Sequence, residues 1–198
     1  MIYQGPGHLR GPFAIGGKSV QVGARCRRLP EVKKSGNTMV ERIKDWMETM
    51  TKPNLPLAGS CRCGKVHVEI TIAPIMTSAC HCRGCQKMSA SAFSLTAMVP
   101  AAGFSVTKGN TRRGGLGEGQ LDHEFCPDCM TWMFTRIEGV DDFLNVRAAL
   151  FDDTAWFTPF IETMTQEKLA WVSLPARHSF EGFPPVEEYQ ALMAEYGQ

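Results

Sequence analysis

The sequence lacks any apolar run of the roughly 18 residues that a membrane-spanning helix needs, so no transmembrane segment is expected. It also lacks an excess of either charge, because 21 lysines and arginines face 20 aspartates and glutamates, giving a formal net charge of +1. Proteins that bind nucleic acid usually carry a basic patch or stripe, so this balance argues against a nucleic-acid partner. No apolar segment follows the first basic residues as it does in a signal peptide, and we expect a cytoplasmic protein.

Acidic residues are scarce in the first 40 positions, where Glu31 is the single acid among seven basic side chains. This stretch is rich in glycine and shows no periodicity, so we expect residues 1–38 to form a disordered basic tail. Apolar residues at helical spacing then predict a short helix and linker over residues 39–56. The compact domain is expected over residues 57–198.

Short alternating runs dominate the chain from Leu57 onward. Val66–Ile72 alternates apolar and polar residues, which is typical of a half-buried strand. Many such runs, separated by clusters of Gly, Pro and Asp, predict a mainly β domain of antiparallel sheets with one helix at its end. The other expected strands are Ala92–Val99, Phe104–Thr107, Asp122–Phe125, Thr131–Ile137, Phe143–Ala149 and Phe160–Thr165, and the expected helix is Val186–Tyr196.

Cysteine is the residue type that carries the chemistry. Clustered cysteines in a reducing compartment indicate metal binding more than disulfides, and zinc takes four tetrahedral ligands that short Cys spacings can supply. The eighth cysteine, Cys26, stands alone in the basic tail and is not expected to be a ligand. The other seven form three motifs: Cys61-Arg62-Cys63-Gly64, Cys80-His81-Cys82-Arg83-Gly84-Cys85 and Cys126-Pro127-Asp128-Cys129.

Two pairs and one triplet predict two zinc ions per chain. The economical partition is a closed four-thiolate site from the two pairs and an open three-thiolate site from the triplet, expected on one loop. Spacing alone also permits other pairings. A structural zinc is normally closed by four protein ligands, whereas a catalytic zinc keeps one position free for water or substrate. The triplet is therefore the candidate reaction site.

Several other residues are weaker candidates. His81 lies between two ligands, so its side chain is expected to point away from the ion, and His123 is not expected to be a ligand either. His81 and Glu118 are the candidate proton shuttles. The glycines between Gly114 and Gly119 lack the Lys-Ser/Thr of a phosphate cradle, and we interpret them as a mobile loop near the third motif. Four aromatic residues are interpreted as core: Trp132, Phe134, Trp156 and Phe157.

The order of the motifs resembles the glutathione-dependent formaldehyde-activating enzyme (GFA) family, also called the centromere protein V/GFA domain. The resemblance covers roughly residues 57–196 and rests on three ordered cysteine motifs. The matching segments are Cys61–Gly64, Cys80–Cys85 and Phe125–Cys129, with further similarity at Ser89–Phe93 and His178–Pro185.

This resemblance implies a β-tent fold of antiparallel sheets held by a structural zinc. It implies that the structural ion is bound by Cys61, Cys63, Cys126 and Cys129, and that a second, catalytic ion is bound by Cys80, Cys82 and Cys85. It also implies a carbon–sulfur lyase similar to S-(hydroxymethyl)glutathione synthase, with a thiol such as glutathione and a small aldehyde such as formaldehyde as partners.

One residue departs from the family pattern. Met130 stands where the family usually has a glycine after the last cysteine. A residue other than glycine at positive φ is uncommon and strained, so this turn either avoids that conformation or tolerates the strain.

Two alternatives to an enzyme remain open. The chain could be a non-enzymatic zinc-binding scaffold or interaction module that uses its basic tail. It could also be a redox protein using the Cys126–Cys129 pair, although no βαβ pattern surrounds that pair.

Overall fold

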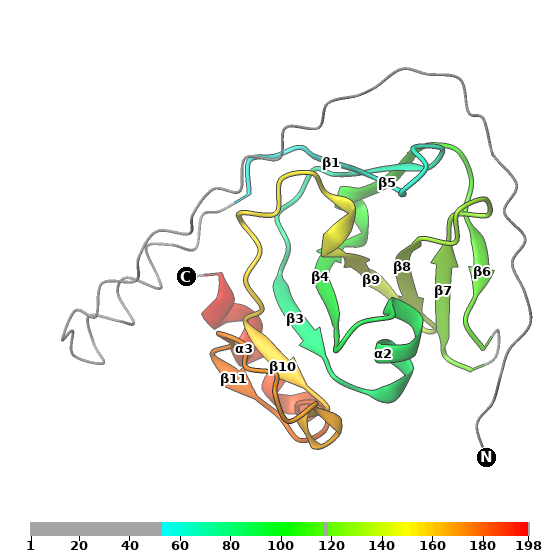
Figure 1. The fold of residues 1–198 in the computed structure, drawn as a ribbon. Helices are drawn as coiled ribbons and strands as arrows, with labels where there is room; N and C mark the ends of the chain where they lie inside the picture. The colour runs from blue at the N-terminus through cyan, green and yellow to red at the C-terminus, as the bar shows by residue number, and fades with distance from the viewer. Residues whose placement is uncertain (1–52, 117–118, 198) are drawn as a thin grey trace, which may run out of the picture. The chain divides into compact units, whose positions relative to one another are not determined.

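The computed structural model describes residues 53–116 and 119–197, and Figure 1 gives the fold. The expected tail, most of the expected segment over residues 39–56, Cys26 and Glu118 lie outside the described residues. Within the described part of the chain, no helix is both long and apolar enough to cross a membrane.

The strands are β1 (Leu57–Ser60), β2 (His67–Ile70), β3 (Met76–Cys80), β4 (Ser94–Pro100), β5 (Phe104–Lys108), β6 (Arg112–Gly114), β7 (Leu121–Phe125), β8 (Trp132–Ile137), β9 (Val140–Arg147), β10 (Ile161–Thr163) and β11 (His178–Ser179). The helices are α2 (Arg83–Ser89) and α3 (Tyr189–Tyr196), and the short 3-10 turns are η1 (Ala101–Gly103), η2 (Ala148–Leu150), η3 (Thr165–Glu167) and η4 (Val186–Glu188).

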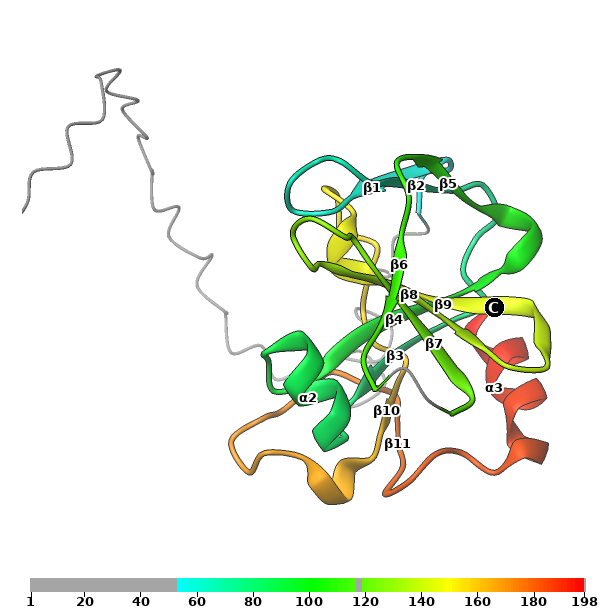
Figure 2. The same cartoon turned by 90° about the vertical axis from the view of Figure 1, so that its right-hand side faces the viewer.

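The strands form two sheets. The smaller sheet has the order β1-β2-β5, and the larger sheet has the order β11-β10-β3-β4-β9-β8-β7-β6. Figure 2 shows the three-stranded sheet at one end of the larger sheet, with α2 and α3 at the other. The expectation of a mainly β fold with a short C-terminal helix is confirmed.

The pairing is antiparallel except at one edge. Strand β10 runs parallel to both β3 and β11, so the larger sheet is mixed and not purely antiparallel as expected. Parallel neighbours cannot be joined by a tight hairpin, and the chain joins β10 to β11 through the longer segment between Thr163 and His178.

The main core lies between the two sheets. Apolar residues that alternate along β2, β4 and β9 all point into it, because every second side chain of a strand faces the same side. Its fully buried members include Val68 and Ile70 from the smaller sheet and Val99 and Leu144 from the larger one. Three of the four aromatics interpreted as core join or pack against this cluster, and the fourth, Trp132, is also buried.

The opposite face of the larger sheet is divided in two. At one end, Met76 of β3 packs with Phe160, Ile161 and the C-terminal helix residue Leu192 in a second apolar cluster. The other end of the face is polar and meets α2, the helix that the sequence did not predict. This polar end is where three of the cysteines lie.

Candidate metal centres

The first pair of cysteines forms a tight turn directly after β1. The Gly64 N–H donates to the Cys61 carbonyl over 2.9 Å, and Gly64 has a φ of +70°, which glycine adopts without strain. The Val66 N–H donates to the Cys61 Sγ at 3.3 Å. These bonds hold the two side chains on one side of the turn.

The second pair lies in a similar turn between β7 and β8. The Met130 N–H donates to the Cys126 carbonyl at 3.0 Å, and the Cys129 Sγ lies 3.1 Å from the Thr131 hydroxyl. Met130 has a φ of +58°, so the turn adopts the left-handed conformation and tolerates the strain.

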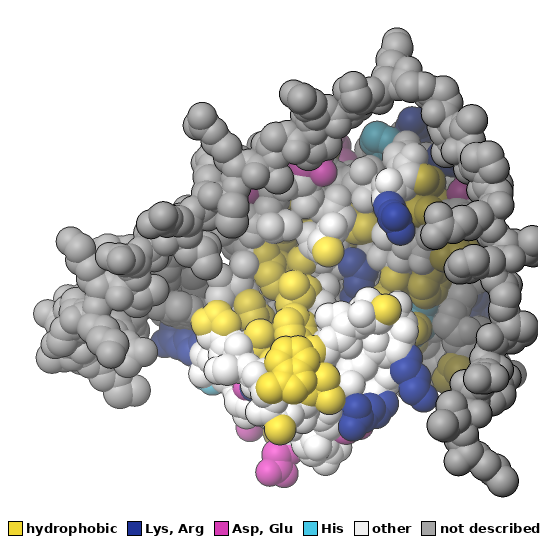
Figure 3. Space-filling model, in the orientation of Figure 1, with side chains coloured by type: hydrophobic (Ala, Val, Ile, Leu, Met, Phe, Trp, Pro, Cys, Tyr) yellow, Lys and Arg dark blue, Asp and Glu magenta, His cyan; other side chains and the backbone are white. Residues whose placement is uncertain are grey.

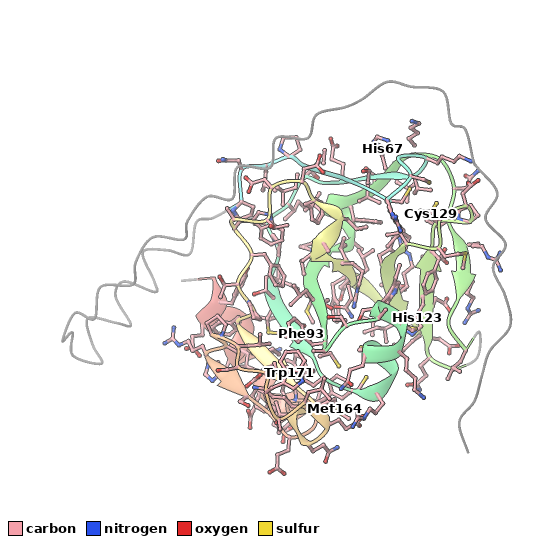
Figure 4. All side chains as sticks on the ribbon, in the orientation of Figure 1. His67, Phe93, His123, Cys129, Met164 and Trp171 are labelled. Atoms are coloured by element: carbon pink, nitrogen blue, oxygen red, sulfur yellow. The ribbon has the colours of Figure 1, made fainter. Side chains whose placement is uncertain are left out.

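The two turns bring four sulfur atoms together. All four ligand atoms lie within 4.8 Å of one another, and Cys63 Sγ lies 3.5 Å from Cys61 Sγ and 3.8 Å from Cys126 Sγ. A zinc–sulfur bond of about 2.3 Å gives a tetrahedron with edges of about 3.8 Å, so the spacing fits one ion. Cys61 and Cys126 belong to the main core, while Cys63 is exposed. The cluster therefore joins the smaller sheet to the larger one, and Figure 4 shows Cys129 at the same end as His67 of β2.

The triplet is built from a strand end and a helix start, not from a loop as expected. Cys80 is the last residue of β3, Cys82 is the N-cap of α2, and Cys85 lies in the first turn of that helix. The Cys85 N–H donates to the Cys82 Sγ at 3.3 Å, so one thiol also caps the helix. The three sulfur atoms lie within 4.8 Å of one another, and each residue is partly exposed.

The neighbouring strands of the larger sheet supply polar side chains to the same face. Cys80 is paired with Ser94 of β4, and Thr96 of β4 is paired with Arg147 of β9. Strand alternation puts these residues on the face opposite the main core. The Arg147 Nη1 donates to the Ser94 Oγ at 3.4 Å, and Ser94 also hydrogen-bonds the Cys85 thiol.

The ionisation of neighbouring thiols shows why a cation fits the triplet. The hydrogen bond with Cys85 is the largest of the effects that lower the pKa of the Cys80 thiol to about 5. The same contact raises the pKa of the Cys85 thiol, and burial raises that of Cys82. One thiolate therefore disfavours the next, and a bound cation would be needed to ionise all three. Both cysteine clusters could hold a metal ion.

Arg147 is a charged residue near the triplet that the sequence did not single out. Its side chain is 9% exposed and its guanidinium lies 4.0 Å from the centre of the Trp132 ring. Burial lowers the pKa of Arg147 to about 10, and the charges of Cys85 and Cys80 oppose that lowering. The sequence offered one signal for it. Arg147 alternates with the apolar residues Leu144 and Val146 along the expected strand, so its side chain, like that of Asn145, faces away from the core.

The two histidines lie outside both sets of converging ligand atoms. His81 follows Cys80 and so faces the other side of β3, where its Nε2 lies 3.1 Å from the Glu162 carboxylate of β10. His123 Nδ1 lies 2.9 Å from the Thr135 hydroxyl, and burial, with the nearby Arg147 charge, lowers the pKa of His123. Figure 4 shows His123 on β7, on the side where α2 lies.

The glycine-rich segment begins as strand β6 and continues into a turn. A Cβ built on Gly115 would lie 2.8 Å from the His123 ring and 3.4 Å from the Met88 sulfur, so the turn packs between β7 and α2. Residues 117 and 118 lie outside the described part of the chain.

The comparisons with known proteins agree on one family. The family model described as "Glutathione-dependent formaldehyde-activating enzyme" matches residues 56–167, more than half of the chain and including all seven clustered cysteines. A Penicillium rubens protein named "Putative glutathione-dependent formaldehyde-activating enzyme" is 31% identical over 105 residues, covering 50% of this chain and 55% of its own length. An Emericella nidulans protein of the same name is 30% identical over 91 residues, covering 44% of this chain and 46% of its own. The chain thus spans about half the length of the curated relatives that it matches.

A solved structure of a Rhodobacter sphaeroides protein is also similar. It is 19% identical with a TM-score of 0.39, over 48% of this chain and 88% of that one.

Proposed function

Because the chain belongs to the glutathione-dependent formaldehyde-activating enzyme family, we propose that it is a zinc-dependent carbon–sulfur lyase. In this proposal two zinc ions bind per chain. The structural ion is held by Cys61, Cys63, Cys126 and Cys129, and the catalytic ion by Cys80, Cys82 and Cys85. The reaction adds a thiol, such as glutathione, to formaldehyde or a related small aldehyde.

The observation that carries the proposal is the difference between the two clusters. Four sulfur atoms lie within 4.8 Å of one another at one cluster, and three do so at the other. Three protein ligands leave one tetrahedral position for a substrate, which distinguishes a catalytic from a structural zinc. All three cysteines of the triplet are partly exposed, so a small molecule can reach them.

The metal, when bound, would lower the pKa of a substrate thiol so that it reacts as a thiolate near neutral pH. The substrate sulfur then attacks the carbonyl carbon, a C–S bond forms, and the C=O π electrons move to oxygen, which takes up a proton. No electrons leave or enter, so the reaction needs no redox partner. The reverse step returns thiol and aldehyde.

The chain's own residues hold the three thiols in place. Thr163 of β10 hydrogen-bonds Cys80, and Ser94 of β4 hydrogen-bonds Cys85. The helix start that carries Cys82 is fixed by the Glu167 carboxylate, which accepts from the Arg83 N–H at 2.6 Å. These bonds would orient the donors before metal or substrate arrives.

The test is exchange NMR spectroscopy of glutathione with formaldehyde, with and without the zinc-loaded protein. We expect the wild type to accelerate exchange and Cys82→Ser to lose the acceleration while keeping its fold. Serine is a good helix N-cap, so this variant removes one thiolate without removing the cap. Circular dichroism and bound zinc per chain are measured on the same samples.

The result that would reject the proposal is wild-type protein with full zinc and no acceleration for any thiol and aldehyde pair tested. That outcome would favour the zinc-binding scaffold. A Cys82→Ser variant that unfolds would instead assign the triplet a structural role.

A further inference from the structure

Arg147 carries a buried positive charge without a carboxylate partner. Among the ion pairs of the described residues none includes Arg147, although its side chain is 9% exposed. Burying an unpaired charge is costly, so an arginine in this position needs a compensating group.

The hydrogen bonds of Arg147 compensate this cost only partly. Its Nη1 donates to Ser94 Oγ and its Nη2 to the Asn145 carbonyl, both at the long distance of 3.4 Å. Its Nε is one of two buried side-chain nitrogen or oxygen atoms without a partner in the described part of the chain. The face of the Trp132 ring attracts the guanidinium cation. The N–H bonds of a guanidinium lie in its own plane, however, so the ring does not serve as the missing acceptor for the Nε–H.

The negative groups on the face that Arg147 shares would be the triplet's cysteines as thiolates, which is the form that binds a metal. Ser94 connects the two, because its hydroxyl accepts from Arg147 Nη1 and it also hydrogen-bonds Cys85, and the charges of Cys85 and Cys80 act on Arg147. Cys80 and Ser94 are cross-strand neighbours on the face that Arg147 shares, so backbone pairing fixes this arrangement. Three thiolates and one divalent cation carry a net charge of −1. An anionic fourth ligand would make the net charge of the site more negative, at −2. A fixed cation beside the site would offset that second charge.

We propose that Arg147 is a specificity-determining positioning residue, which makes the open position of the Cys80/Cys82/Cys85 site prefer an anion over a neutral ligand. The inference rests on the proposed function, because it concerns the ligand class of that same site. For the proposed reaction, this preference would favour binding of the substrate thiol as its thiolate. Neutral ligands such as water and imidazole would gain less from Arg147, because they carry no net charge.

The experiment uses full-length protein loaded with Co²⁺, whose visible absorption reports on coordination. Thiocyanate, an anion, and imidazole, a neutral ligand, are titrated separately, and the change in the spectrum gives a dissociation constant for each. In the proposed function the four-thiol site is closed, so it should not respond. Cys82→Ser checks this, because the ligand-dependent change should disappear in that variant.

Removing the charge should affect only the anion. We expect Arg147→Met to weaken thiocyanate binding by about tenfold or more and to leave imidazole within about threefold. Arg147→Lys keeps the charge and should retain most of the preference. Arg147→Gln loses the charge but keeps a donor toward Ser94, so it serves where the methionine variant does not fold.

The matched control is Arg136→Met, which removes an exposed arginine of β8 that lies over Phe134, with 5.7 Å to the ring centre. It should change neither dissociation constant. An equal loss of both ligands in the Arg147 variants would mean a merely structural role and would overturn the inference, as would an unchanged preference. Because the readout is ligand binding, absence of lyase activity in the exchange assay would reject the proposed function without deciding this point.

Discussion

At the scale of single residues, backbone conformation separates the two turns of the four-cysteine cluster. Gly64 and Met130 both have positive φ, at +70° and +58°. A left-handed conformation costs a residue with a side chain roughly 1–2 kcal/mol relative to glycine. The first turn therefore avoids a strain that the second one keeps.

Exchanging these residue types should change stability in opposite directions. Met130→Gly is expected to stabilise the zinc-loaded protein by about 0.5–1 kcal/mol, because strain is relieved and the Met130 side chain, 50% exposed, loses little packing. Gly64→Ala is the matched control. It should destabilise by about 1 kcal/mol, since a Cβ at Gly64 meets no atom within 4 Å and only the backbone changes. Both are measured by calorimetric unfolding, and a destabilised Met130→Gly would show that the methionine side chain matters more than its φ.

At the scale of elements, β10 is joined to the end of β3 by a side-chain contact as well as by backbone pairing. The Glu162 carboxylate accepts from the Lys168 ammonium at 2.7 Å and lies 3.1 Å from His81 Nε2. Burial opposes the ionisation of Glu162, but hydrogen bonds from Lys168, Ser179 and His81 outweigh it and hold its pKa below the usual value. This network stands on the side of β3 opposite Cys80, so it supports the strand that carries a ligand.

Neutralising that carboxylate should weaken the protein in a pH-dependent way. Glu162→Gln is expected to cost about 1–2 kcal/mol at pH 7. A carboxyl whose pKa is lowered by folding stabilises the protein above its unfolded pKa of about 4.3, and that contribution disappears as the pH falls through the folded pKa. The difference between wild type and variant should therefore shrink below about pH 4, as measured by urea unfolding at a series of pH values.

Glu195→Gln is the control for the Glu162→Gln variant. Glu195 also contacts a basic residue and a histidine, Arg177 and His178, but its side chain is 30% exposed. Exposed ion pairs contribute little, so we expect a loss of less than about 1 kcal/mol at pH 7. Equal losses in the free energy of unfolding for the two variants would contradict the claim that Glu162 stabilises the contact between β10 and β3.

The elements that the sequence predicted are those with a clear period. The runs at β2, β4, β5, β7, β8, β9 and β10 were all expected, because alternating apolar residues mark a half-buried strand. Strand β3 was missed because Met76–Cys80 contains three small residues and no regular alternation. Helix α2 was missed because it is short, contains Gly84 and buries no residue, so it has no apolar face to detect.

The candidate site was predicted in part for the same reason. Local spacing identified the seven clustered cysteines, whereas Arg147 reaches the triplet through a pairing of strands about 50 residues apart in sequence, which no local pattern encodes.

At the scale of the whole molecule, the two ends of the larger sheet carry different features. Cys129 of the four-cysteine cluster lies at the end near the smaller sheet (Figure 4), and α2 and α3 lie at the other (Figures 1 and 2). In Figure 3 hydrophobic side chains gather over the segments that follow β10, where Trp171 is 76% exposed, with basic side chains beside them. Of these features, the four-cysteine cluster is the one that connects the two sheets. We therefore expect that cluster to control the stability of the whole domain.

Loss of one ligand should therefore have unequal effects at the two clusters. Cys63 is exposed, so Cys63→Ser removes a ligand with little loss of packing, yet it opens the cluster that joins β1 to β7. Metal binding by such a cluster contributes directly to folding, and we expect Cys63→Ser to lower stability by about 3 kcal/mol or more. Cys82→Ser should cost less than about 1 kcal/mol, because α2 buries no residue and serine keeps the N-cap. Thermal unfolding with bound zinc per chain distinguishes the two. Equal destabilisation at equal zinc loss would mean that the triplet also holds the fold together, and an unchanged Cys63→Ser would mean that the two sheets are joined by their apolar core alone.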